Sequence, residues 1–124
     1  MMSQFKVLIV EDSRLFRQVF RELLHTRFQS FDIYEAANEE EALRITESTL
    51  PDLIFMDIRL REANGLDLIK RIKARHPKIV CIVFTAYDTE YREAARECAD
   101  YYLSKRSTSE DVFALIESIL LTKA

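Results

Sequence analysis

Polar residues suited to chemistry follow four short apolar runs of this 124-residue sequence. A single acid, hydroxyl or lysine in such a place is a weak sign of a site, because these residue types also cap helices and cover surfaces. Four runs that all end in this way are more informative. The residues are Glu11 and Asp12 after the run 7–10, Asp57 after 53–56, Thr85 after 79–84, and Lys105 after 101–103.

The three carboxylates would repel one another in a shared pocket, so that pocket needs a positive charge. Magnesium suits them because it takes oxygen ligands and keeps several waters. Lys105 would supply a point charge for an anion, and the hydroxyl of Thr85 can donate a hydrogen bond to it. Together these groups suit an aspartate that acquires a phosphoryl group, whose charge the metal and the lysine neutralise.

The composition indicates one ordinary globular domain, which we expect to span residues 1–124. With 48% hydrophobic residues the chain can bury a core, and its net charge of −3 argues against direct binding of nucleic acid. The longest apolar stretch, 79–84, is too short to cross a bilayer, and no signal peptide opens the sequence. We therefore expect a cytoplasmic protein without membrane contact. Cys81 and Cys98 form no metal motif and are expected to be reduced and mostly buried.

The apolar runs are β-branched or aromatic and lack polar alternation, as is typical of strands buried on both faces of a parallel sheet. A fifth run, 31–36, carries Asp32 and Glu35, as an edge strand can. Helical patterns separate the runs. This alternation favours right-handed crossovers and an open α/β sheet with helices on both faces. Ligands of such sheets bind beyond the carboxyl ends of the strands, where the polar residues would lie.

Five helices are expected around these strands. They begin after Ser13, near Asn38, after Gly65, near Thr89, and at a capping box formed by Ser107 with Glu110. The first would bury a face made of Phe16, Val19, Phe20, Leu23 and Leu24. The fourth would bury only Tyr91, Ala94, Ala95 and Cys98. We therefore expect the fourth helix to pack weakly and to be mobile.

These features occur together in a known family. The sequence resembles the receiver domains of two-component response regulators over essentially its whole length. The stretches that carry the resemblance are VLIVEDSR, PDLIFMDIRL, NGLDLIKRIK, IVFTAYD and YYLSK. The resemblance implies a flavodoxin-like (βα)5 doubly wound sandwich, with a five-stranded parallel sheet in the order 2-1-3-4-5.

The resemblance also implies a phosphoacceptor and a metal site. Asp57 would receive a phosphoryl group from a phosphohistidine on a sensor histidine kinase or on a histidine phosphotransfer protein. Magnesium, or manganese, would be held by Asp12, Asp57 and the backbone carbonyl of Arg59. Glu11 would act on the metal mainly through water.

Other residues would bind the phosphoryl group and respond to it. Lys105, the Thr85 hydroxyl and the backbone amide of Ala86 would bind its oxygens. Tyr102, at the family's aromatic switch position, would turn into the space that Thr85 leaves. This would reshape the face of the fourth helix, fifth strand and fifth helix, which would control a partner, an output domain or a homodimer. We expect a switch that assists its own phosphotransfer and autodephosphorylation, not an enzyme.

Three positions depart from the family pattern. Arg106 stands where many receivers have a proline after the lysine. We predict that the Lys105–Arg106 bond is nonetheless cis, although a cis bond before a non-proline residue costs about 3 to 4 kcal/mol. Arg61 replaces a common proline, and Cys98 replaces a usual glycine. We expect these two replacements to alter loops rather than the chemistry.

Two large side chains flank the route that a water molecule would take to the phosphorylated aspartate. Arg59 and Tyr87 lie two residues beyond Asp57 and Thr85. We therefore predict slow self-dephosphorylation, and faster loss of phosphate in an Arg59→Asn, Tyr87→Ala double variant.

A candidate docking surface lies on the first helix, beside the acid pair. Leu15 projects away from the expected buried face of that helix. With Arg14, Gln18 and Glu22 it forms a surface that a kinase or phosphotransfer protein could recognise. This interpretation depends on the resemblance more than on the pattern, since exposed leucines are common.

Three other functions stay open from the residues alone. A receiver-like adaptor would work without phosphorylation, although the complete set of acids, threonine and lysine disfavours it. A magnesium-dependent aspartyl-phosphate phosphatase would use the same groups, but it usually needs a second acid two residues after the nucleophile, where this chain has Arg59. A flavodoxin-like cofactor binder would need a phosphate-binding loop after the first strand, and the sequence there offers none.

Overall fold

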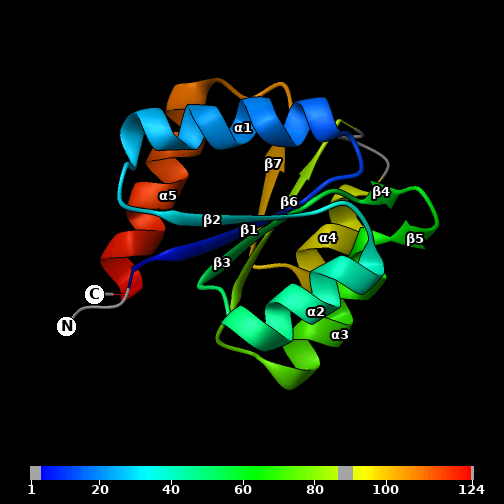
Figure 1. The fold of residues 1–124 in the computed structure, drawn as a ribbon. Coiled ribbons are helices and arrows are strands. Elements are labelled where there is room, and N and C mark those ends of the chain that lie inside the picture. Colours follow the sequence, from blue (N-terminus) through cyan, green and yellow to red (C-terminus); the bar gives the residue numbers. More distant parts are fainter. Residues whose placement is uncertain (1–3, 87–90, 124) are drawn as a thin grey trace.

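A parallel sheet lies at the centre of the protein, whose computed structural model describes residues 4–86 and 91–123 (Figure 1). Its strands are β1 (Lys6–Val10), β2 (Asp32–Ala36), β3 (Leu53–Met56), β6 (Val80–Thr85) and β7 (Tyr101–Ser104). They lie in the order β2-β1-β3-β6-β7, and every neighbouring pair is parallel. Counted along the chain this is the order 2-1-3-4-5, so the predicted fold is confirmed. The run 31–36 forms an edge strand, as expected.

Helices cover both faces of this sheet. They are α1 (Arg14–Arg27), α2 (Glu39–Thr49), α3 (Gly65–Arg75), α4 (Arg92–Cys98) and α5 (Ser109–Lys123). In Figure 1, α1 and α5 pack on one face, whereas α2, α3 and α4 pack on the other. Within the described ranges, no helix is long and apolar enough to cross a membrane.

The core has two layers because the sheet is buried on both sides. Leu53 and Phe55 of β3 belong to an aromatic-rich cluster beneath α1 and α5. The alternate residues Ile54 and Met56 belong to the cluster beneath α2, α3 and α4. All four side chains are buried, which explains why this run shows no polar alternation.

The first two helices begin where the sequence predicts. The Ser13 side chain accepts a hydrogen bond from the Phe16 amide at 3.2 Å, and the Asn38 side chain accepts one from the Glu41 amide at 2.9 Å. Such caps satisfy backbone donors that have no partner inside the helix. They fix where α1 and α2 start, directly after β1 and β2.

The predicted capping box of α5 is wrong by one residue. Thr108 and Asp111 form the reciprocal pair: the Asp111 amide donates to Thr108 Oγ1 at 3.1 Å, and the Thr108 amide donates to Asp111 Oδ2 at 3.3 Å. Ser107 instead belongs to the preceding turn, because its amide donates to the Ser104 carbonyl at 3.0 Å.

Two predictions of burial are also wrong. Val19 is 55% exposed, because Phe20 and Leu24 form the inward face of α1 and Val19 points about a quarter-turn away from it. Ala94 is exposed on α4, where Ala95 is the buried residue. This single buried side chain agrees with the weak packing expected of α4. The predicted start of that helix at Thr89 lies outside the described residues.

A short hairpin follows β3 and was not predicted. Its strands β4 (Arg59–Leu60) and β5 (Ala63–Asn64) are antiparallel, and they pair Arg59 with Asn64 and Leu60 with Ala63. The hairpin lies beyond the carboxyl ends of the main strands (Figure 1). It connects Asp57 to the start of α3.

Candidate functional site

Three predicted acids meet beyond the carboxyl ends of β1 and β3. Glu11, Asp12 and Asp57 each offer a carboxylate oxygen, and these oxygens all lie within 4.8 Å of one another. The Asp57 amide donates to the Val10 carbonyl at 3.1 Å, which extends the pairing of β1 and β3 by one step. Parallel pairing therefore brings together residues more than forty positions apart in the sequence.

Lys105 forms ion pairs with two of these acids. Its ammonium Nζ lies 3.1 Å from Asp57 Oδ2 and also contacts Glu11 Oε1. Burial by itself lowers the pKa of Lys105, but the hydrogen bond to Glu11 and the charge of Asp57 outweigh it, so the pKa is raised. The lysine is therefore a cation at physiological pH, and it offsets part of the repulsion among the acids.

Asp57 has one free acceptor in this site. Its Oδ1 is buried and has no hydrogen-bond partner among the described residues. A buried carboxylate oxygen without a partner is costly unless a cation or donor occupies the space beside it. The atom therefore fits a metal ligand, as does the set of hard oxygen donors around it.

The Asp12 carboxyl is the most exposed of the three acids and has a raised pKa. The causes are a hydrogen bond with Glu11, then partial burial and the charge of Glu11, while the charge of Arg61 acts in the opposite direction. Next to Asp12 is a cavity of about 290 Å³ that Arg61 and Glu62 also line. A divalent cation would offset the charge of Glu11, which is one of these causes.

Glu11 is held by its neighbours through four polar atoms. Its amide donates to the Ala36 carbonyl at 3.0 Å, and its Oε2 accepts from the Ser13 amide at 2.7 Å. Its Oε1 accepts from Lys105, and its backbone carbonyl accepts from the Arg17 guanidinium. The first acid of the pair is thus fixed in orientation.

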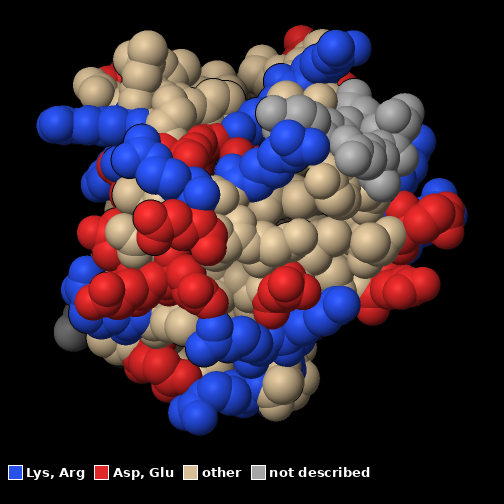
Figure 2. Space-filling view, turned by 90° about the vertical axis from the view of Figure 1, so that its right-hand side faces the viewer, with Lys and Arg blue, Asp and Glu red and all other residues tan. Residues whose placement is uncertain are grey.

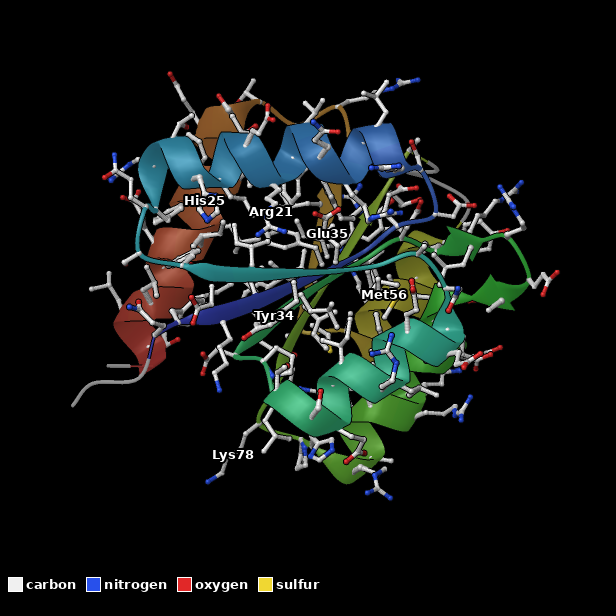
Figure 3. The ribbon with its side chains drawn as sticks, in the orientation of Figure 1. Arg21, His25, Tyr34, Glu35, Met56 and Lys78 are labelled. Carbon is white, nitrogen blue, oxygen red and sulfur yellow. The ribbon has the colours of Figure 1, made fainter. Side chains whose placement is uncertain are left out.

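Arg17 is a site residue that the sequence did not reveal. Besides Glu11, its guanidinium contacts Glu35 Oε1 on β2 at 3.1 Å, and Arg21 contacts the other oxygen of Glu35 at 3.0 Å. Figure 3 shows Arg21 and Glu35 facing one another between α1 and β2. A usable signal was the arginine one turn into the helix after the acid pair, matched by an acid on the neighbouring strand.

Thr85 and Tyr102 lie on the adjacent strands β6 and β7. Thr85 is fully buried at the end of β6, its carbonyl accepts from the Lys105 amide at 2.8 Å, and Ala86 follows it at the surface. Tyr102 is half-buried, and the guanidinium carbon of Arg92 on α4 lies 5.8 Å from the centre of its ring. The predicted switch pair is therefore close to both the site and α4.

The predicted cis bond is wrong: the Lys105–Arg106 peptide is trans. Without a proline the cis form costs about 3 to 4 kcal/mol, which favours the trans form here. With a trans bond the lysine already reaches Asp57 and Glu11.

The two remaining groups of predicted residues lie on the protein surface. Arg14, Leu15, Gln18 and Glu22 are all exposed on α1, where Leu15 is 72% exposed and Val19 joins them. Arg59 is exposed too, and its guanidinium donates to the Tyr91 hydroxyl at 3.4 Å. Tyr87 lies outside the described residues. Figure 2 looks onto the end of the molecule where the hairpin of β4 and β5 lies, and it shows acidic and basic side chains around a broad area without charged side chains.

The sequence and the fold are similar to those of known proteins over most of the chain. The family model described as response regulator receiver domain matches residues 7–117. The transcriptional regulatory protein YdfI of Bacillus subtilis is 34% identical over 117 residues, which cover 93% of this chain and 54% of YdfI. The chain spans about half the length, or less, of the first curated relatives that it matches.

Solved structures agree with this similarity. A two-component response regulator of the LuxR family from Aurantimonas is 27% identical with a TM-score of 0.87, over 97% of this chain and 87% of that one. The response regulator TrrA from Thermotoga maritima, solved in complex with Mg²⁺-BeF, is 27% identical with a TM-score of 0.83, over 92% and 97% of the two chains. This chain therefore belongs to the response regulator receiver domain family of two-component signalling.

Proposed function

We propose that this receiver accepts a phosphoryl group on Asp57 from a phosphohistidine of a sensor histidine kinase or a histidine phosphotransfer protein. The observation that carries the proposal is the 3.1 Å ion pair of Lys105 with Asp57 inside a cluster of three carboxylates. A carboxylate with a cation fixed beside it is suited to gaining negative charge. We propose that residues 1–124 act as one such domain.

Asp12, Asp57, the backbone carbonyl of Arg59 and, through water, Glu11 would hold Mg²⁺ or Mn²⁺. Support comes from the clustered carboxylates and from the unpartnered Oδ1 of Asp57. TrrA, whose structure contains Mg²⁺-BeF, offers a precedent in a similar receiver. The bound ion supplies positive charge against the acids and the phosphoryl oxygens.

During transfer, the bond between phosphorus and the donor imidazole nitrogen breaks while a bond from phosphorus to an Asp57 oxygen forms. The imidazole keeps the electron pair of the broken bond. Lys105 would shift part of its charge to the phosphoryl oxygens, and the Thr85 hydroxyl and Ala86 amide would donate hydrogen bonds to them. The chain assists its own phosphorylation and acts as a switch.

The phosphoryl group would change the face formed by α4, β7 and α5. If Thr85 moves toward the phosphate, Tyr102 can occupy the space behind it and alter its contact with α4. Changing the ratio of active to inactive conformations of this face from 1:99 to 99:1 requires that phosphorylation favour the active one by about 5.5 kcal/mol. We infer a small free-energy gap between the two states, because Ala95 is the one fully buried residue of the described helix α4. The altered face would then bind an output domain, a partner or a second copy.

The donor protein would dock on α1. Arg14 and Leu15 begin this helix directly after the acid pair, and the exposed residues Gln18 and Glu22 continue the surface along it. Val19 extends their apolar part. A partner seated there would lie next to Asp57.

The proposal is tested with Mg²⁺ and a small-molecule phosphodonor, followed by intact mass measurement. We expect wild type to gain one phosphoryl group, and Asp57→Asn to gain none. Asp67→Asn removes an exposed aspartate of α3 outside the site and should be labelled like wild type. Labelling that persists in Asp57→Asn, or a wild type that is never labelled, would refute the assignment.

A further inference from the structure

The ring of Phe16 forms one wall around the ammonium of Lys105. Lys105 Nζ lies 4.2 Å from the ring centroid, well inside the range of about 6 Å for cation–π attraction. The same ammonium contacts the carboxylates of Glu11 and Asp57. Two anions and one aromatic face therefore surround it.

Other aromatic side chains fix the position of this ring. It stacks on Phe20 at 5.9 Å and meets Phe84 at 5.8 Å between centroids. Both neighbours are buried in the cluster beneath α1 and α5, and Phe84 directly precedes Thr85. Phe16 cannot turn away from Lys105 without disturbing this aromatic cluster.

Little water can enter between the ring and the lysine. The space that Phe16 lines with Glu11, Asp57, Phe84 and Lys105 has no room for a water molecule. Attraction between an ammonium and a ring face is stronger where water is excluded. The ring is thus an electrostatic partner for the ammonium, which an aliphatic side chain would not be.

We propose that Phe16 is a positioning residue for phosphorylation, which holds the Lys105 ammonium beside Asp57 through its ring face. A lysine side chain has four rotatable bonds and loses much conformational entropy when its ammonium is fixed. Phe16 contributes to this fixing before the phosphoryl group arrives. The inference rests on the proposed role of Lys105 in binding that group.

If Phe16 only packed in the core, fluorination of its ring would not change the labelling rate. Fluorine atoms on the ring withdraw electron density from its face while changing its size little, so they weaken cation–π attraction and keep the packing. Phe20 is a matched control, because it lies in the same aromatic cluster and stacks on Phe16. Fluorination there should leave Lys105 unaffected.

The experiment incorporates phenylalanine with one, two or three ring fluorines at position 16, and in parallel at position 20. Labelling of Asp57 by a small-molecule phosphodonor with Mg²⁺ is followed by intact mass. We expect the labelling rate to fall with each fluorine at position 16, by about two- to five-fold over the series. The logarithm of the rate should fall in even steps. The position 20 series should show no such trend.

A second measurement does not depend on phosphotransfer. The NMR signals of the Lys105 side-chain methylenes should be shifted upfield by the ring in wild type, and this shift should vanish in Phe16→Leu. An absent shift in wild type would overturn the contact itself. Failure of wild type to be labelled would overturn the proposed function. If wild type is labelled but fluorination at position 16 does not change the rate, or fluorination changes it equally at positions 16 and 20, only the role of Phe16 is overturned.

Discussion

Gly65 lies so close to Asp57 that a β-carbon at position 65 would be 1.9 Å from the Asp57 carbonyl oxygen. The Gly65 amide also donates to the Ile58 carbonyl at 2.7 Å. The start of α3 is therefore packed directly against the backbone that carries the proposed phosphoacceptor. No side chain fits there unless that backbone shifts.

Gly65→Ala should displace the Asp57 loop. We expect the free energy of unfolding to fall by about 1 to 3 kcal/mol, as for other overpacked positions, and labelling of Asp57 to slow. Urea denaturation and intact mass measure the two effects. Asn64→Ala is the control, because it removes only the cap of α3, a 2.8 Å bond to the Leu66 amide worth about 1 kcal/mol. A Gly65→Ala chain as stable as wild type would contradict the close approach.

Arg17→Met should weaken Mg²⁺ binding. Arg17 fixes the backbone carbonyl of Glu11, next to Asp12, and residues that support metal ligands typically contribute about ten-fold or more to affinity. Arg21→Met is the matched control, since Arg21 shares the contact with Glu35, whereas the hydrogen bond to the Glu11 carbonyl comes from Arg17. Calorimetric titration with Mg²⁺ should show a clear loss for Arg17→Met and little for Arg21→Met. Equal losses would assign the effect to Glu35 or to general stability.

Local patterns in the sequence predicted the sheet and the acids of the site. Strands buried on both faces need continuous apolar runs, so Leu53–Met56 stands out from any helical pattern. The acids follow such runs directly, and parallel topology then brings Asp12 and Asp57 together. Arg17 was missed because its partners are a backbone carbonyl and a glutamate on another strand, which only the folded chain brings near.

Other errors come from ambiguous local signals. Ser107 and Thr108 are both good caps, and a turn bond from Ser107 decides between them. Val19 and Phe20 both fit a helical apolar face, and only packing on the sheet selects Phe20. The hairpin of β4 and β5 has two residues per strand, which is too short for a periodic pattern.

Asp12 should make the metal-free protein less stable as pH rises. Hydrogen bonding with Glu11, burial and the charge of Glu11 raise its pKa above the ordinary value of 3.8, so the folded chain binds this proton more tightly than the unfolded chain. At pH values between the ordinary pKa and the raised pKa of Asp12, the chain takes up a proton when it folds. The contribution of Asp12 to stability is therefore present at low pH and is lost as pH rises through the folded pKa.

Asp12→Asn should remove this dependence. In chelator at neutral pH we expect the variant to exceed wild type in stability by roughly 0.5 kcal/mol, a small effect because Asp12 is partly exposed. Excess Mg²⁺ should stabilise wild type but not the variant. Urea denaturation across pH tests both points, with Asp67→Asn as a control for loss of one surface charge. Parallel pH profiles for wild type and Asp12→Asn would contradict the expectation.

The two thiols should differ in reactivity. Burial raises the pKa of Cys81 to about 12, so this thiol is protonated at neutral pH and shielded by the core. Cys98 is half-buried, and its pKa is raised by that burial to a smaller extent. A thiol reagent should modify Cys98 first and Cys81 only on unfolding. Loss of the early phase in Cys98→Ser would support this order, whereas a persistent early phase would assign it to Cys81.

Loss of phosphate should be slow in wild type and several-fold faster in the Arg59→Asn, Tyr87→Ala double variant. Arg59 lies two residues after Asp57, and its guanidinium is held near the Tyr91 ring at 5.8 Å and the Tyr91 hydroxyl at 3.4 Å. Smaller side chains would open a route for water to the aspartyl phosphate. Intact mass after removal of the donor gives the rate, with Arg71→Asn on α3 as a control for loss of an exposed arginine. An unchanged rate in the double variant would show that water does not reach the phosphate along this side.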